Sequence, residues 1–125
     1  MNRSCITQTG LVLLLVVSTF CPALYADFKP EQHVIVQSEA NRPTSVYAAD
    51  LDGDGDLDVL SAYWDDAEIA WYANDGTGQF GPQQVITTEA DGANCVYAAD
   101  LDGDGDLDVL SASGGDDKIA WYENE

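Results

Sequence analysis

Short apolar runs alternate with clusters of glycine, aspartate and asparagine along most of the chain. Runs of this length, bounded by turn-forming residues, predict β-strands. No stretch carries an apolar stripe at helical spacing, so helices are not expected. We therefore expect an all-β fold with eight short strands. The predicted strands are Val34–Val36, Val46–Ala49, Val59–Ala62, Ile69–Tyr72, Val85–Thr88, Val96–Ala99, Val109–Ala112 and Ile119–Tyr122.

The pattern is an internal repeat. The segment from Val46 to Ala62 recurs without a change from Val96 to Ala112, and the same offset of 50 residues maps Ile69–Tyr72 onto Ile119–Tyr122. Four short strands in about 50 residues fit one blade of a β-propeller. An immunoglobulin-like sandwich also has short strands, but it does not explain identical halves.

The fold class that follows is two four-stranded antiparallel propeller-type blades, which together make a partial β-propeller. We place the two sequence units at residues 27–78 and 79–125, joined at a turn cluster that ends with Gly78.

Residues 1–26 predict a secretory signal peptide. Arg3 supplies a positive charge before the apolar run 11–17, and Ala26 offers a small residue at the cleavage site. The run is shorter than the roughly 20 residues that a membrane span needs. We therefore expect a secreted, extracellular protein with no membrane insertion after cleavage.

The composition is strongly acidic, with 23 acidic and 4 basic residues and a formal net charge of −19. Nucleic acids and anionic membrane surfaces both select basic proteins, so neither is an expected partner. Signal cleavage removes Cys5 and Cys21, which leaves Cys95 without a partner for an internal disulfide. A bound cation is the expected alternative means of stabilisation.

Each repeat carries five aspartates within nine residues. Two neighbouring carboxylates repel by about 1 kcal/mol in water and by about 4 kcal/mol near a protein surface, so a compact loop requires a positive charge inside it. Oxygen ligands without His or Cys favour Ca²⁺ or Mg²⁺ over Zn²⁺, and a cage made wholly by protein favours Ca²⁺. We predict two Ca²⁺ sites. The first has the side chains of Asp50, Asp52, Asp54 and Asp58 with the backbone carbonyl of Asp56, and the second has Asp100, Asp102, Asp104, Asp106 and Asp108 in the same roles.

Two calcium-binding motifs begin like the acidic loop but do not match it. An EF-hand loop needs a glutamate at its twelfth position, where this chain has Ser61 and Ser111. The repeats of calcium-binding β-helices recur every nine residues, whereas these recur after 50. A solvated acidic turn without an ion remains the alternative, and two identical copies disfavour it.

Together these segments resemble a known family. The sequence Asp-Leu-Asp-Gly-Asp-Gly-Asp-Leu-Asp, then Val-Leu-Ser-Ala and Ile-Ala-Trp-Tyr, and the segment from Asn74 to Pro82 are similar to the FG-GAP/VCBS repeat, which resembles the blades of the integrin α-subunit propeller. The resemblance covers essentially the whole chain after residue 26. It implies calcium in the hairpin loop of each blade and extracellular adhesion, or a scaffold that binds a glycan or protein. Family propellers close with roughly seven blades, so two blades imply exposed sheet edges. Either the chain is a fragment of a longer propeller, which is the interpretation we favour, or several copies self-associate through these edges.

No catalytic arrangement is evident, and we expect that the protein is not an enzyme. Glu39 and Glu89 are equivalent by the repeat, whereas a catalytic carboxylate pair needs two different environments. His33 has no counterpart in the second repeat, and Cys95 is expected to be a small buried residue.

The tryptophans allow two interpretations. Trp71 and Trp121 repeat at a strand position, which favours core packing. Trp64 is not repeated, so with Tyr63 it could stack on a sugar, or it could cover a sheet edge.

The function expected from these features is a secreted, non-enzymatic calcium-binding module that serves adhesion or binds an extracellular glycan or protein. The alternatives are an accessory module of a secreted polysaccharide-degrading enzyme and a structural spacer stiffened by calcium.

Overall fold

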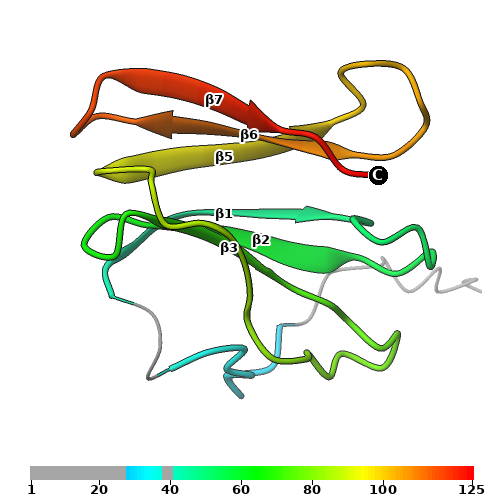
Figure 1. Ribbon diagram of the computed structural model, residues 1–125. Helices are drawn as coiled ribbons and strands as arrows, with labels where there is room; N and C mark the ends of the chain where they lie inside the picture. The colour runs from blue at the N-terminus through cyan, green and yellow to red at the C-terminus, as the bar shows by residue number, and fades with distance from the viewer. Residues whose placement is uncertain (1–27, 38–40) are drawn as a thin grey trace, which may run out of the picture. The chain divides into compact units, whose positions relative to one another are not determined.

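Figure 1 shows the computed structural model of the chain, which describes residues 28–37 and 41–125. Residues 33–125 form one compact unit, and the fold below is that of this unit. The described residues contain seven strands and no helix. The strands are β1 (Pro43–Ala49), β2 (Asp58–Tyr63), β3 (Glu68–Tyr72), β4 (Gln84–Thr87), β5 (Ala93–Ala99), β6 (Asp108–Ser113) and β7 (Lys118–Tyr122).

The predicted signal peptide, residues 1–26, lies outside the described residues. Within the described part of the chain, nothing helical could cross a lipid bilayer.

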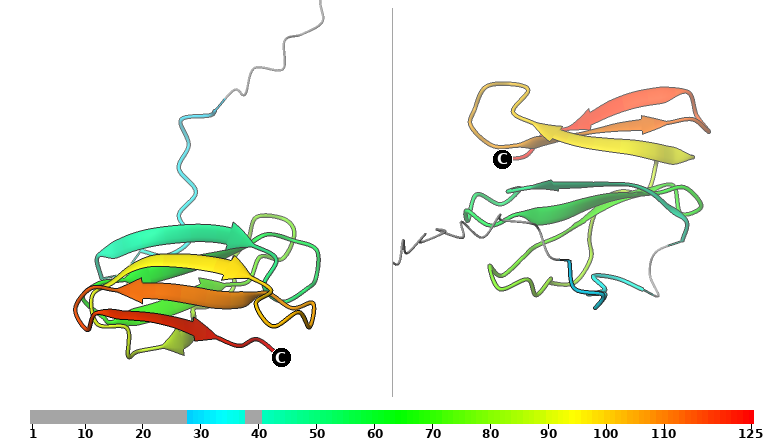
Figure 2. Two further views of the ribbon diagram at one scale, coloured as in Figure 1. Left: turned by 90° about the horizontal axis from the view of Figure 1, so that it is seen from above. Right: turned by 180° about the vertical axis from the view of Figure 1, so that it is seen from behind.

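The strands form two antiparallel sheets that run up and down in chain order. The first sheet has the order β1-β2-β3-β4 and the second has the order β5-β6-β7. Leu60 pairs between Tyr47 and Trp71, and their counterparts 50 residues later pair in the same register. The sheets lie as two layers, and neither closes on itself (Figures 1 and 2). The predicted all-β fold, a partial propeller of two antiparallel blades, is therefore confirmed.

One predicted strand is wrong. Val34–Val36 is not a strand, so the described residues have seven strands where we expected eight, and the second sheet has three. Its counterpart in the next repeat is β4, which pairs with β3. Val34–Val36 has no such strand before it within the described residues, and a strand forms only where another strand accepts its hydrogen bonds. The first sheet thus takes its fourth strand, β4, from the following sequence unit.

The core lies between the two sheets. Strand residues alternate between faces, so the apolar positions that face the other sheet follow one another at every second residue. They form one buried cluster that includes Leu60, Ala62 and Ile69 from the first sheet and Val96, Ala98 and Val109 from the second.

Two hydrogen bonds join β1 to β5 across this interface. The hydroxyl of Thr44 donates to the carbonyl of Ala93 over 2.7 Å, and the amide of Val96 donates to Ser45 Oγ over 3.3 Å. The two innermost strands are therefore fixed side by side, with their acidic loops at the same end (Figure 1).

The first sheet carries a network of three buried hydroxyl groups, whereas the second has the pair Ser111 and Tyr122, whose hydroxyl oxygens lie 3.3 Å apart. Ser61 donates to the Tyr63 hydroxyl over 2.8 Å, and the Tyr63 and Tyr72 hydroxyls lie 2.7 Å apart. Buried hydroxyls are stable only with partners, so this network satisfies three polar groups at once. In the second repeat Ser113 replaces Tyr63 and bonds to Asp116 in the adjoining turn.

Candidate metal centre

The two acidic loops are the connections from β1 to β2 and from β5 to β6. Each turns through two glycines with positive φ, which are 76° at Gly53 and 96° at Gly55 in the first loop, and 85° at Gly103 and 107° at Gly105 in the second. Other residues rarely adopt this conformation, so the glycines allow the tight curl that brings alternate side chains together.

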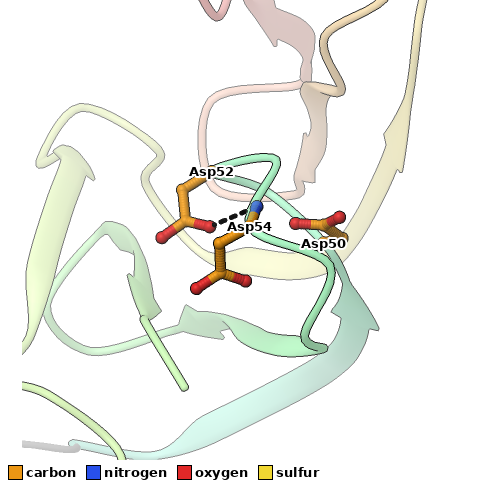
Figure 3. A group of neighbouring side chains, drawn as sticks. All are labelled: Asp50, Asp52 and Asp54. Carbon is orange, nitrogen blue, oxygen red and sulfur yellow. Dashed lines mark hydrogen bonds between the residues drawn. The ribbon is translucent and has the colours of Figure 1, made fainter. Parts of the chain in front are cut away.

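In the first loop three carboxylates converge. Asp50, Asp52 and Asp54 each offer an oxygen, and these oxygens lie within 4.8 Å of one another (Figure 3). Backbone amides hold the carboxylates in place, because the Asp54 amide donates to Asp52 Oδ1 over 3.2 Å and the Asp56 amide donates to Asp54 Oδ1 over 2.9 Å. The Gly55 amide donates to Asp50 Oδ2 over 3.1 Å.

The other oxygen of Asp50 has no partner. Oδ1 is buried and accepts no hydrogen bond. A buried carboxylate oxygen without a partner is destabilising, because it has lost the hydrogen bonds that water would make. A cation among the three carboxylates would restore a partner to this oxygen, so the loop's oxygen-only donor set fits a hard divalent ion.

The second loop brings together a slightly different group. Here Asp100, Asp102 and Asp108 offer oxygens within 4.8 Å of one another. The Gly103 amide donates to Asp100 Oδ1 over 2.7 Å, and the Asp104 amide donates to Asp102 Oδ1 over 3.2 Å. Of the predicted side-chain ligands, Asp58 in the first loop and Asp104 in the second lie outside the converging groups.

Loss of hydration and neighbouring negative charges raise the pKa of the central aspartate of each converging group. The pKa of Asp52 is raised by loss of hydration and by the charges of Asp58, Asp54 and Asp50, against a smaller lowering by the Asp54 amide. At Asp102 the Asp104 amide lowers the pKa, but loss of hydration and the neighbouring carboxylates outweigh it and raise the pKa overall. The charged form of Asp52 and of Asp102 is therefore less favourable than that of a free aspartate, and a positive charge among the carboxylates would offset this.

Asp58 and Asp108 are the two fully buried acids, and they clamp the ends of the loops. Asp58 Oδ2 accepts the Leu51 amide over 2.9 Å, and its Oδ1 accepts the Asn74 amide over 2.8 Å. Asp108 does the same with Leu101 over 3.0 Å and with Asn124 over 2.9 Å. Each clamp ties the start of its loop to the second residue after the third strand of its sheet.

The predicted backbone ligands point their side chains elsewhere. Asp56 Oδ2 lies against Gly76, so close that a Cβ at that glycine would clash with it. Neither Asp56 nor Asp106 belongs to a converging group.

Comparison with protein families gives a match over most of the described fold. The FG-GAP-like repeat matches the chain twice, at residues 25–61 and 50–111, and the two matches overlap on the first acidic loop. The chain belongs to the FG-GAP-like repeat family. No curated protein and no solved structure matches it.

Two asparagines also support the loops of this FG-GAP-like repeat protein, although we did not predict them. Asn74 donates its side-chain amide to the Leu57 carbonyl over 3.1 Å. Asn124 donates its side-chain amide to the Leu51 carbonyl of the first loop over 2.9 Å, and to Leu107 in the second over 3.4 Å. Both residues lie 50 positions apart after the Ile-Ala-Trp-Tyr strand, so the repeat contained the signal that could have identified them.

Some sequence-based expectations for the FG-GAP-like repeats change with the structure. Cys95 is exposed, not buried, because it lies on the outer face of β5, which no described segment covers. Tyr63 is buried in the hydroxyl network and cannot stack on a sugar. Trp64 lies over Arg42, with the guanidinium 5.0 Å from the ring centre, and its far end approaches Gly92.

The tryptophans repeated between the units differ in burial. Trp71 packs against the core, whereas Trp121 is exposed. Of the acids weighed as a catalytic pair, Glu89 is exposed and Glu39 lies outside the described residues.

Proposed function

We propose that this FG-GAP-like repeat protein is a secreted, non-enzymatic module that binds two calcium ions and serves adhesion or the binding of an extracellular glycan or protein. The observation that carries the proposal is the first loop, where three carboxylates converge and Asp50 Oδ1 is buried without a partner. A second converging group in the next repeat supports it.

Some aspartates would bind the ions, and others hold the loops against the sheets. Asp50, Asp52 and Asp54 would hold the first ion, and Asp100, Asp102 and Asp108 the second. When bound, the ion supplies the positive charge that neutralises the repulsion among these carboxylates. Asp58 clamps the first loop to the sheet through two backbone amides, and the Asp108 clamp has the same form. The chain thereby presents two preformed loops at one end of the two sheets.

Calcium binding is tested by isothermal titration calorimetry. The chain is expected to bind two Ca²⁺ ions per molecule, Asp52→Asn is expected to lose the first site, and Asp102→Asn the second. Asp65→Asn is the matched control because it also removes one exposed negative charge but lies in the β2–β3 turn. A flat titration of the unaltered chain, or a stoichiometry unchanged in both loop variants, contradicts the assignment.

The adhesive role is tested on glycan and protein arrays. If the calcium-ordered loops form the binding surface, array signals with calcium are expected to fall by at least about tenfold when a chelator is added. The Asp52→Asn, Asp102→Asn double variant is expected to show the same low signal without a chelator. Signals that are equal in all these conditions exclude a role for the loops, and no signal on any array removes the adhesive function while leaving calcium binding intact.

A further inference from the structure

The outer face of the second sheet is apolar and uncovered. We call it the open face and define it by Tyr97, Leu110, Ile119 and Trp121. Ile119 is 82% exposed and Trp121 is 47% exposed, and with Leu101 and Leu110 they line a shallow hollow. Viewed from above, no described segment lies over this face (Figure 2, left).

In the first repeat the counterparts of the open face are covered by the second sheet. The counterparts of the open face in the first sheet are Tyr47, Leu60, Ile69 and Trp71. Leu60 and Ile69 have no exposed surface, and Tyr47 and Trp71 pack against the core, because the second sheet lies on them. The open face is therefore a second copy of a surface that already binds a sheet within this chain.

The complementary surface is also present and exposed. The side of the second sheet that packs on the first includes Val96, Ala98 and Leu107, of which Val96 is only 4% exposed. We call their counterparts Val46, Ala48 and Leu57 the rear face. Val46 is 70% exposed and Leu57 is 60% exposed.

We propose that the open face of one chain binds the rear face of a second copy, head to tail, and repeats between chains the packing that joins the two sheets within a chain. Both halves of a working interface are present in identical residue types. The open face is uncovered within the described residues, and on the rear side of the first sheet the β1 residues Val46 and Ala48 are exposed, whereas Ser61 and Ala70, which lie beside them on β2 and β3, are already buried. A partner of another chemistry would have to imitate the rear face, whereas a second copy carries it.

The unpaired strand edges fit the same arrangement. β7 has no strand on its outer side within the described residues, although its sequence from Ile119 to Tyr122 is identical to that of β3, which pairs with β4. The counterpart of β4 is Val34–Val36, which is exposed or half-buried and unpaired. Residues 33–37 lie on the side of the first sheet that carries the rear face (Figure 1). In the proposed assembly this segment adds to β7 of the neighbouring chain, as β4 adds to β3.

Charge sets the conditions for association. The net charge of −19 opposes contact between copies, so association requires salt or bound cations to screen it. The proposal does not depend on the calcium sites, because the apolar faces and the strand edges lie outside the converging carboxylates.

The test is complementation between two variants of the full chain, followed by light scattering after size exclusion at physiological ionic strength. The unaltered chain is expected to exceed its monomer mass of 13.4 kDa. Ile119→Lys damages the open face and Val46→Lys damages the rear face, and each is expected to weaken self-association by at least about tenfold because a lysine charge would be buried unpaired. Ile119→Val, which stays apolar, is the matched control and is expected to associate.

Mixing the two lysine variants distinguishes head-to-tail binding from other modes. Each retains one intact face, so an equimolar mixture is expected to form a dimer and stop there. Association of Val46→Lys by itself would show that two open faces bind each other and would overturn the proposal. A monomeric unaltered chain at high concentration, or a mixture of folded variants that stays monomeric, would also overturn it.

A disulfide provides a second measurement that leaves the apolar faces intact. The Val96 amide contacts Ser45 Oγ within the chain, and the counterparts of these residues are Val46 and Cys95. Val46→Cys is therefore expected to form an intermolecular disulfide with Cys95 of a second copy, mapped by mass spectrometry. Thr77→Cys, an exposed position in a turn, is the control. Equal cross-linking by both variants would contradict the proposed register.

Discussion

Removal of calcium is expected to lower the free energy of unfolding of this chain by about 5 kcal/mol when the ion is otherwise present at 100 times its dissociation constant, since each of the two sites contributes about 2.7 kcal/mol under that condition. The physical reason is the convergence of carboxylates in both loops, which without a cation repel one another and leave Asp50 Oδ1 unpartnered. Urea denaturation followed by tryptophan fluorescence, with calcium and with a chelator, measures the difference.

The matched control is the double variant Asp52→Asn, Asp102→Asn. It removes one like charge from each loop and the sites with them, so a chelator should no longer change its unfolding midpoint. If the unaltered chain unfolds at the same urea concentration with and without calcium, the ions do not stabilise the fold.

Replacement of Asp58 by alanine is expected to destabilise the chain by about 3 kcal/mol even in the presence of a chelator. The side chain is fully buried, and both its oxygens accept backbone amides, from Leu51 and from Asn74. Alanine would leave these two amides without acceptors and would leave a cavity beside them. Denaturation in chelator isolates this effect from any contribution of a bound ion.

Asp56→Ala is the matched control for the clamp. Asp56 lies two residues earlier in the same loop, and its carboxylate accepts none of the backbone amides that hold the loop. Its loss is expected to change the free energy of unfolding by no more than about 0.5 kcal/mol. Equal destabilisation by both substitutions would mean that the effect of Asp58→Ala does not come from loss of the clamp.

The repeat explains why much of the fold could be predicted. A segment that recurs at a fixed offset must take the same local structure twice, and the strands β1 to β3 and β5 to β7 do so in the same register. The strand predicted at Val34–Val36 was wrong because a strand depends on a neighbouring strand, and the sequence of the segment alone does not reveal whether that neighbour is present. The predicted burial of Cys95 was wrong for a similar reason, since burial depends on what lies over a sheet face.

The aspartates of the candidate site were predicted from the sequence, but the role of each aspartate was not. Spacing places the aspartates of each loop near one another, and three converge in each. It does not show which carboxylate turns into the sheet, because that depends on amides brought there by the third strand. Asp58 was therefore expected to face an ion, whereas in the structure it holds the Leu51 and Asn74 amides.

Asn124 links the two loops of this chain to one another. Its backbone amide bonds to Asp108 at the base of the second loop, and its side chain bonds to the Leu51 carbonyl at the start of the first. A shift of either loop must therefore strain or relieve the other through a single residue. We therefore expect two ions held in these loops to bind with cooperativity, in which case thermodynamic linkage requires that each alters the affinity of the other by the same factor.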